Sequence, residues 1–398
     1  MNSFLYSEVT QLLNEALRMK GLHCTIMLLW LFSTTAAAEV GVTENTITFG
    51  MSNALSGPAS GLGSGVKAGT LAYFEKVNQQ GGIHGRKIKV ISLDDGYEPD
   101  RAAKNAKRLI YTDKVFALVS FVGTPTSKAV VPEVNRAKIP YIGPFTGAEF
   151  LRNPANKNIF NIRASYFSET KKLVDHFIDD LGYKKIAVFI QDDGYGAAGK
   201  AGVQRALRMR GLKIHAEGRY KRNTLDVEQG LNSIIAKKPD AVIMVGAYKA
   251  CGEFIKMSQS KGFSPKFANI SFVGTKKLIA ELGNAGDGSY ISQVMPNPDE
   301  SSLDIIKDFK ADMLNYGVDN PYYTQLEGYL NAMVIVDALE QSGEYLTRDR
   351  FIGAMEGMKN KDFGGLKINF GKSDRQGLDD VYLTQIQDGK ALPIQTMK

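Results

Sequence analysis

Apolar and polar positions alternate in a regular way along the chain from about residue 45 onward. Short apolar runs are each followed by a break rich in Gly, Ser, Thr or Tyr, and then by a stretch whose apolar residues recur every three or four positions. Short runs bounded by turn residues predict buried strands, and the three-to-four-residue spacing predicts amphipathic helices. The alternation of the two predicts an α/β protein with parallel sheets.

The pattern falls into two blocks. In the first block the predicted strands are 47–51, 88–93, 116–121 and 139–142, and the predicted helices are 66–78, 99–111 and a stretch after Thr126. The second block opens after Asn161, with predicted helices 168–181 and 197–210, predicted strands 186–190, 241–245 and 267–270, and then helices 303–316 and 327–342 and a strand at 383–387. A chain of 398 residues exceeds the roughly 250–300 at which one core stops growing, so we expect two domains.

The first 38 residues do not follow this pattern. After Met19 come a basic residue, an apolar run at 26–32 and the small residues Ala36-Ala37-Ala38, as in a cleaved secretory signal. The apolar run is shorter than the about 20 residues that a membrane-spanning helix needs. We therefore take residues 1–38 as a signal peptide whose true start is Met19; the alternative for residues 1–18 is an amphipathic amino-terminal helix. Cleavage after Ala38 leaves 398 − 38 = 360 residues and sends the protein to the periplasm.

Charge and candidate chemistry exclude several classes of protein. The net charge of +7 is spread out, and the densest basic cluster, from Arg205 to Lys213, has the spacing of one helix surface, so we expect no nucleic-acid partner. Of the two cysteines, only Cys251 lies outside the signal, and we expect a packed thiol there. The sequence contains no His-x-x-x-His, Cys-x-x-Cys or Gly-x-Ser-x-Gly pattern. We therefore expect no catalytic residues, no metal and no cofactor.

A nucleotide-dependent α/β enzyme is the enzyme alternative. It is suggested by Gly61-Leu62-Gly63-Ser64-Gly65, which precedes a predicted helix. The dinucleotide fingerprint requires a third glycine three residues after the second, and Val66 stands there. Export also argues against this alternative, because nicotinamide cofactors are cytoplasmic molecules.

A spaced set of motifs identifies a family. These motifs are Leu55-Ser56-Gly57-Pro58, Asn78-Gln79-Gln80-Gly81-Gly82-Ile83-His84-Gly85-Arg86-Lys87, Asp94-Asp95, Arg101-Ala102-Ala103, Ile139-Pro140-Tyr141-Ile142, Asp192-Asp193-Gly194-Tyr195-Gly196 and Glu327-Gly328-Tyr329. Together they cover about residues 45 to 390, and the chain resembles the periplasmic leucine/isoleucine/valine-binding proteins.

The resemblance implies a type I periplasmic binding protein. Such a protein has two doubly wound lobes joined by three crossovers, closes like a flytrap on a small amino acid or related carboxylate or amide, and delivers it to the membrane subunits of an ABC permease. We place the amino-terminal lobe at 44–162 and 295–372 and the carboxyl-terminal lobe at 163–294 and 373–398. We expect a monomer. A ligand sensor of the same fold, signalling to a receptor or regulator, is the second alternative.

The predicted ligand residues follow predicted strands, and ligands of open α/β sheets bind beyond the carboxyl ends of strands. On the resemblance they are Thr124, Thr146, Tyr195, Tyr248 and Ser271. Thr124 and Thr146, with the backbone N–H groups of Gly123 and Gly147, are suited to a ligand carboxylate.

Aromatic side chains complete the predicted site. Tyr195 and Tyr248 offer an aromatic wall from the other lobe. Tyr195 lies in an Asp-Asp-Gly-Tyr-Gly segment that we interpret as a loop with little core to pack against. A functional role for this tyrosine is therefore favoured.

Two positions depart from the family pattern. Ser271 stands where the amino-acid binders place a glutamate for the ligand ammonium, and Leu62 stands where the branched-chain binders carry an aromatic residue. Either another carboxylate takes the ammonium, with Asp193, Glu253 and Glu327 as candidates, or the ligand has no ammonium, because a buried charge without a partner costs several kcal/mol.

Overall fold

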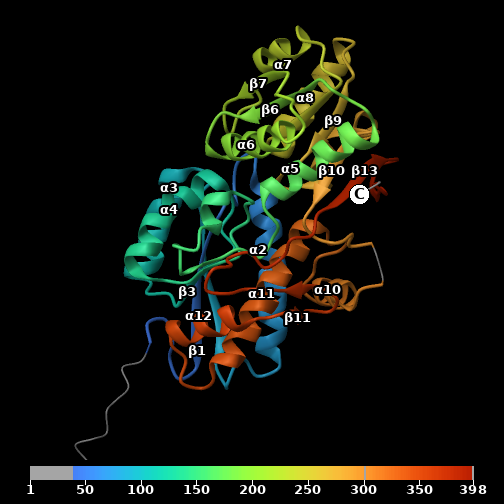
Figure 1. Ribbon diagram of the computed structural model, residues 1–398. Helices are drawn as coiled ribbons and strands as arrows, with labels where there is room; N and C mark the ends of the chain where they lie inside the picture. The colour runs from blue at the N-terminus through green and yellow to red at the C-terminus, as the bar shows by residue number, and fades with distance from the viewer. Residues whose placement is uncertain (1–38, 300–301, 397–398) are drawn as a thin grey trace, which may run out of the picture. The chain divides into compact units, whose positions relative to one another are not determined.

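The computed structural model describes residues 39–299 and 302–396, so the predicted signal peptide lies outside the described residues. Figure 1 shows the two lobes, one built mainly from the amino-terminal half and the helices after residue 304, the other from the middle of the chain.

The first lobe contains a parallel sheet with the strand order β2-β1-β3-β4-β5. Its strands are β1 (Thr46–Asn53), β2 (Lys87–Asp94), β3 (Ala117–Val119), β4 (Tyr141–Ile142) and β5 (Ile159–Phe160). Its helices are α2 (Ser60–Gln79), α3 (Pro99–Lys107), α4 (Thr124–Ala137), α10 (Asp304–Asn315), α11 (Tyr323–Ser342) and α12 (Arg348–Gly357), with a short hairpin of β11 (Lys361–Asp362) and β12 (Lys367–Ile368).

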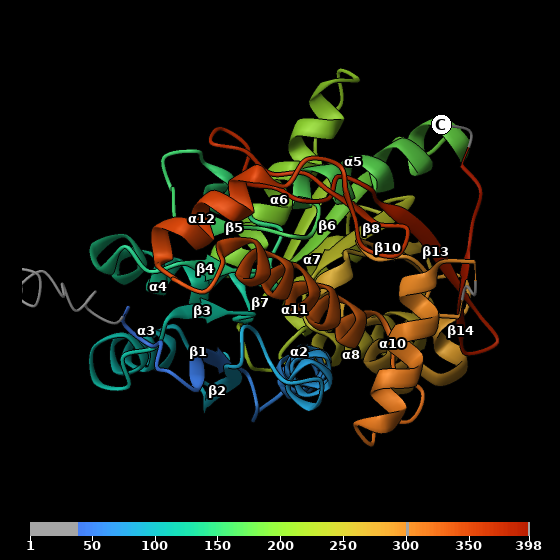
Figure 2. The same cartoon turned by 90° about the horizontal axis from the view of Figure 1, so that it is seen from below.

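Helices cover both faces of this sheet because its strands are apolar on both faces. In β3, Ala117 and Val119 belong to the core beneath α2 and α11, whereas Leu118 between them belongs to the core beneath α3 and α4. Figure 2 shows α3 and α4 on one side of the strands and α2 and α11 on the other.

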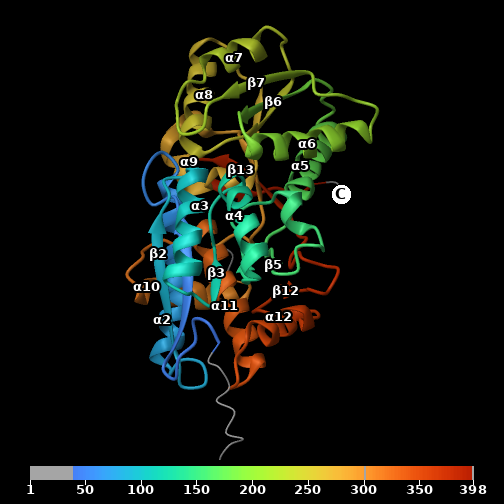
Figure 3. The same ribbon diagram turned by 90° about the vertical axis from the view of Figure 1, so that its left-hand side faces the viewer.

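The second lobe contains a mixed sheet with the order β14-β13-β10-β9-β8-β6-β7. Its strands are β6 (Ile186–Gln191), β7 (Ala216–Tyr220), β8 (Ala241–Val245), β9 (Lys266–Asn269), β10 (Tyr290–Gln293), β13 (Tyr382–Gln387) and β14 (Lys390–Pro393), of which β13 and β14 are antiparallel. Its helices are α5 (Tyr166–Asp175), α6 (Gly194–Arg208), α7 (Glu228–Ile235), α8 (Tyr248–Ser260) and α9 (Thr275–Leu282). Figure 3 shows α7 above β6 and β7, and α5 and α6 below them.

The parallel strands of the two lobes follow the same order. β7-β6-β8-β9-β10 repeats β2-β1-β3-β4-β5, so each sheet reverses its winding direction between its first and third strands. Ligands of doubly wound sheets bind at such a switch point. The chain passes between the sheets after β5, after β10 and before β13. The doubly wound, two-lobed fold class is confirmed, while the exact lobe boundaries given above stay a prediction.

Several elements begin earlier than the sequence pattern predicts. Helix α4 begins at Thr124 and not after Thr126. Helix α6 begins at Gly194 and not at 197, because the Asp193 side chain caps it by accepting a hydrogen bond from the Tyr195 backbone N–H at 2.9 Å. Among the described residues, no helix has both the length and the apolar character that crossing a membrane requires.

Candidate functional site

Two threonines lie together at the edge of the first sheet. Thr124 begins α4 after β3, and Thr146 follows β4, so the parallel order brings both to the carboxyl ends of neighbouring strands. Their hydroxyl oxygens are 2.7 Å apart and both residues are buried. The Thr146 hydroxyl also donates to the Tyr166 hydroxyl at 3.3 Å, which links the pair to the first residue of α5 in the second lobe.

A cluster of buried aromatic rings joins the two lobes beside this pair. Phe272, from the short helix Ser271–Val273, lies 5.9 Å from the Tyr97 ring and 5.5 Å from the Phe145 ring, both of the first lobe. It also lies 4.5 Å from the Tyr195 ring of its own lobe, and Tyr195 in turn lies 5.6 Å from the Tyr166 ring. These spacings are those of favourable aromatic pairs.

Tyr195 differs from its prediction in one respect. The sequence pattern suggested a loop with little core around it, and this is wrong, since Tyr195 lies in the first turn of α6 and is fully buried. Gly194 and Gly196 flank it, and Gly196 packs so closely on the backbone of Gln191 that an added Cβ would lie 1.9 Å from that oxygen. Tyr195 packs there against Phe272 and Tyr166, which belong to its own lobe.

The two glycines next to the threonines have different surroundings. Gly123 has φ of +107° and its N–H donates to the Phe145 oxygen at 3.1 Å, so this amide is used within the fold. An added Cβ at Gly123 would lie 2.3 Å from the Tyr97 ring. Gly147 lies against Tyr166, whose N–H donates to the Gly147 oxygen at 2.7 Å. Both glycines thus allow aromatic side chains to approach the threonine pair.

Leu62 and Tyr248 meet on another side of the lobe contact. The Tyr248 hydroxyl accepts a hydrogen bond from the Gly61 N–H at 3.3 Å, and Leu62 packs against Gly274 of the second lobe. Gly274 has φ of +80° and an added Cβ would lie 2.6 Å from the Leu62 side chain. A side chain at position 274 is therefore incompatible with this contact.

Polar residues at the rim also bridge the lobes. Arg222 donates to Glu98 of the first lobe at 2.8 Å and to Asp193 of its own lobe at 3.0 Å. Asn223 donates to Glu98 at 2.6 Å and to the Gly96 oxygen at 3.1 Å. We call Arg222, Asn223, Glu98 and Gly96 the rim clasp.

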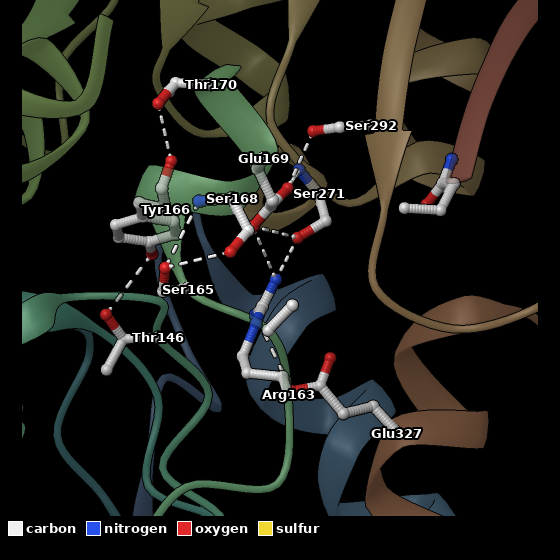
Figure 4. Close-up of polar contacts among 12 residues, drawn as sticks. Thr146, Arg163, Ser165, Tyr166, Ser168, Glu169, Thr170, Ser271, Ser292 and Glu327 are labelled. Carbon is white, nitrogen blue, oxygen red and sulfur yellow. Dashed lines mark hydrogen bonds and ion pairs between the residues drawn. The ribbon is translucent and has the colours of Figure 1, made fainter. Parts of the chain in front are cut away.

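A buried charged cluster lies at the first crossover, and Figure 4 shows its contacts. Arg163, between β5 and α5, donates to the Ser271 hydroxyl and lies 3.4 Å from Glu169 of α5. Glu169 accepts hydrogen bonds from the Ser271 N–H at 2.7 Å, the Ser271 hydroxyl at 3.0 Å and the Ser292 hydroxyl at 2.7 Å. Position 271 therefore lies directly beside a carboxylate, although it is itself a serine.

Glu327 of α11 completes this cluster from the first lobe. Its carboxylate lies 3.6 Å from Arg163 Nη1, and the two side chains are 4% and 0% exposed. The pKa of Glu327 is raised to about 7, first by burial and further by the negative charge of Glu169, while Arg163 opposes the shift. The Arg163 guanidinium also lies over the Phe145 ring, 4.8 Å from its centre, which places the cluster next to the threonine pair.

The remaining candidates are placed as follows. Asp193 lies at the rim, paired with Arg222. Glu253 is half-buried on α8, and in the described chain no hydrogen bond or ion pair joins it to the cluster. Cys251 is a buried free thiol whose pKa is raised by burial. Within residues 39–299 and 302–396, no group of His, Cys, Asp and Glu side chains could hold a metal ion.

The sequence reasoning missed Arg163, Glu169, Tyr166, Tyr97 and Phe272. A signal for the first of these was present: Arg163 directly follows the apolar residues Ile159, Phe160 and Ile162, and an arginine is rarely fully buried unless it is paired. The aromatic residues carry no such local signal, because their grouping depends on how the lobes meet.

Comparisons with known proteins agree with this geometry. Residues 46–391 match the family described as periplasmic binding protein. A structure from Rhodopirellula baltica SH 1, named as a possible leucine/isoleucine/valine-binding protein, is 35% identical with a TM-score of 0.85, over 90% of this chain and 98% of that one.

Two curated relatives are more distant. Leu/Ile/Val-binding protein homolog 8 of Brucella abortus is 23% identical over 87% of this chain and 90% of the relative. The leucine-, isoleucine-, valine-, threonine- and alanine-binding protein of Pseudomonas aeruginosa is 22% identical over 77% of this chain and 81% of the relative. These matches confirm the predicted resemblance, and they confirm that the chain is a binding protein and not an enzyme.

Proposed function

The chain belongs to the periplasmic binding protein family, and from this membership we propose that it is the substrate-binding component of an ABC transporter. It holds a small carboxylate between its lobes and delivers it to the permease. The signal-like residues 1–38 supply export to the periplasm.

The buried threonine pair is the observation that carries this proposal. Two hydroxyl groups 2.7 Å apart can turn their donors to the two oxygens of one carboxylate. Thr124 is the first residue of α4, and the partial positive charge at a helix amino terminus favours an anion there. No cationic side chain is needed for such binding.

The aromatic cluster suits the apolar body of the same ligand. Phe145 and Tyr97 of the first lobe face Phe272 of the second, and all three are buried. Ligand sites are mostly apolar with a few placed polar groups. A ligand with an apolar or aromatic side group fits walls of this composition.

Contacts between the lobes support closure as part of binding. Gln191 of the second lobe donates to the Tyr97 hydroxyl at 3.3 Å, and Tyr248 and the rim clasp bridge the lobes elsewhere. A ligand that contacts both lobes favours the closed state by its difference in affinity for the closed and open states.

A ligand screen with matched variants tests the proposal. Thermal shifts of the purified protein are recorded with amino acids, amides and simple aromatic and aliphatic carboxylates, since a ligand at 100 times its Kd adds about 2.7 kcal/mol. We expect carboxylates to raise the Tm, and small-angle scattering to show compaction with the same compounds.

Two threonine variants then locate the site. Thr124→Val and Thr146→Val should each weaken binding by about 1 to 3 kcal/mol through lost hydrogen bonds. Thr384→Val is the control, because Thr384 is also a buried hydroxyl but lies on β13 and donates to the Ile291 oxygen. Unchanged affinity in both cleft variants would mean that the ligand binds elsewhere.

A further inference from the structure

Arg152 stands at the end of the segment that carries one of the two threonines. Thr146 is followed by Gly147, Ala148 and the short helix Glu149–Arg152. The Ala148 N–H donates to the Thr146 hydroxyl at 3.3 Å, and Arg152 Nη1 donates to the Ala148 oxygen at 3.0 Å. Thr146 and Arg152 therefore hold the same residue, Ala148, through its two backbone groups.

The other donors of Arg152 go to two of the crossovers between the lobes. Nη2 donates to the Arg163 oxygen at 2.9 Å and to the Ala164 oxygen at 3.3 Å, in the first crossover, which joins β5 to α5. Nε donates to the side-chain oxygen of Gln376 at 2.6 Å, in the third crossover, which joins β12 to β13. One guanidinium thus connects the first lobe to both of these crossovers.

The two crossovers that Arg152 connects also pair with each other. The Asn161 N–H donates to the Arg375 oxygen at 2.9 Å, and the Gly377 N–H donates to the Asn161 oxygen at 2.8 Å, which makes a parallel bridge between Asn161 and Gln376. Because the hinge of a two-lobed protein lies in the few residues that join its lobes, Arg152 contacts the hinge itself.

Arg152 is held by hydrogen bonds to uncharged groups. Its four hydrogen bonds all go to carbonyl or amide oxygens. Burial of the guanidinium lowers the pKa of Arg152 to about 10, and the charge of Arg163 acts in the same direction, while Glu149 and Glu169 oppose the shift. The planar fork of an arginine suits oxygens in a fixed arrangement, so these four contacts form together only when the first lobe and the crossovers stand as they do here.

The arrangement that Arg152 stabilises is one in which the lobes touch. Ala148 belongs to the first lobe, whereas Arg163 leads into α5 of the second, so a rotation of one lobe against the other changes the distance between their carbonyl groups. In the same arrangement the Phe272 ring of the second lobe lies 5.5 Å from the Phe145 ring of the first.

We infer that Arg152 is a positioning residue for ligand binding, which couples the threonine pair to closure of the lobes. This inference rests on the proposed function, in which the threonine pair takes the ligand carboxylate and the lobes close. A carboxylate that binds the Thr146 hydroxyl fixes the segment from Thr146 to Ala148, and through Arg152 this segment fixes both crossovers. Coupling between sites is carried by such contiguous hydrogen bonds, and Arg152 needs no contact with the ligand.

The variant Arg152→Met tests the coupling in the purified protein. The probe is whichever of the twenty amino acids, 4-methylpentanoate and 3-phenylpropanoate raises the Tm of the unmodified protein most. Arg152→Met should weaken binding of the probe by about fivefold or more through faster dissociation, since coupling between sites is typically about 5- to 150-fold. At saturating probe, the decrease in the radius of gyration should be smaller than in the unmodified protein.

Arg348→Met is the matched control. Arg348 is also a half-buried arginine that donates to backbone oxygens, those of Val115 and Phe116, but all three residues belong to the first lobe. Its loss should lower stability and leave the Kd, the dissociation rate and the compaction unchanged. All proteins are compared at a temperature at which circular dichroism shows them fully folded.

A second variant changes the other partner of the contact. Gln376→Met removes the acceptor in the third crossover and leaves Arg152 in place. It should weaken binding of the probe as well, and the double variant should bind no more weakly than Arg152→Met alone, because the two changes remove the same contact. If Arg152→Met does not fold, unchanged binding in Gln376→Met overturns the inference.

The outcomes separate the two proposals. An unmodified protein that binds the probe and becomes more compact, together with an Arg152→Met variant that does both to the same extent, overturns the inference and leaves the proposed function standing. Equal losses in Arg152→Met and Arg348→Met also overturn the inference, because the effect is then a general loss of stability. Binding of none of the amino acids, amides or carboxylates overturns the proposed function, and the inference falls with it.

Discussion

Glu327 links the stability of the protein to pH at the scale of a single residue. Its pKa is about 7 in the folded protein against a usual value of 4.5. Below about pH 4.5 the group is protonated in both states, and its contribution to stability is fully present. As the pH rises toward 7, the unfolded chain loses the proton while the folded protein keeps it, so this contribution is lost.

Glu327→Gln should therefore flatten the pH dependence of stability. A shift of this size corresponds to on the order of 3 kcal/mol between about pH 4.5 and pH 7. Asp95, whose pKa is raised to about 6 by burial, acts in the same direction and remains in both proteins, so the difference between them isolates Glu327. Urea unfolding of both proteins at several pH values measures this difference in the free energy of unfolding. Parallel curves of stability against pH would contradict a raised pKa of Glu327.

Some residues of the candidate site could be predicted from the sequence and others could not, because only some of them have a position that the order of elements determines. Thr124, Thr146, Tyr195 and Tyr248 follow strands, so their place at the carboxyl edge of a sheet can be deduced from the order of elements. The charged cluster depends instead on contacts such as that of Arg163 with Ser271, which is 108 residues away, and no local pattern encodes that approach.

At the scale of elements, α2 and α11 lie in very close contact. An added Cβ at Gly69 of α2 would lie 1.9 Å from the Gln325 oxygen, and one at Gly328 of α11 would lie 2.1 Å from the Val66 oxygen. The two helices therefore pack backbone to backbone. This contact also sets the position of Glu327, the residue before Gly328.

Gly69→Ala should destabilise the first lobe by about 1 to 3 kcal/mol or more, because the helices must separate to admit the methyl group. Gly353→Ala in α12 is the matched control: no atom lies within 4 Å of its added Cβ, so the change should stabilise by about 0.5 to 1 kcal/mol through helix propensity. Urea midpoints of the two variants give both values, and equal effects would show that packing at Gly69 is not tight.

Two of the strands that the sequence predicted are fully buried. β6 and β8 are buried at every position and read as continuous apolar runs. β7, with the sequence Ala-Glu-Gly-Arg-Tyr, is an edge strand with exposed and polar positions, and β5 has only two residues, so neither has an apolar run that reveals it. β5 and β7 are strands because they pair with the neighbouring strands β4 and β6.

The proposed closure of the two lobes concerns the whole molecule, and the contacts between the lobes are of two kinds. The aromatic cluster is fully buried, whereas Glu98 and Arg222 of the rim clasp have side chains that are 42% and 22% exposed. Exposed ion pairs contribute little, about 0 to 1 kcal/mol, and salt screens them. If the lobes close as proposed, we therefore expect the rim clasp to adjust the balance of open and closed forms and the buried contacts to determine the geometry of the closed form.

Glu98→Gln should shift this balance toward the open form, because it weakens the contacts of the first lobe with both Arg222 and Asn223. We expect a larger radius of gyration for the ligand-free protein, ligand affinity up to about fivefold weaker through faster dissociation, and less response to added salt.

Glu217→Gln is the matched control: Glu217 pairs with Arg219 and Lys200, all within the second lobe, so it tests loss of an ion pair without loss of a lobe contact. Small-angle scattering and stopped-flow dissociation at low and high salt compare the two. A change of equal size in both variants would mean that the effect arises within one lobe, and the rim clasp would then have no part in closure.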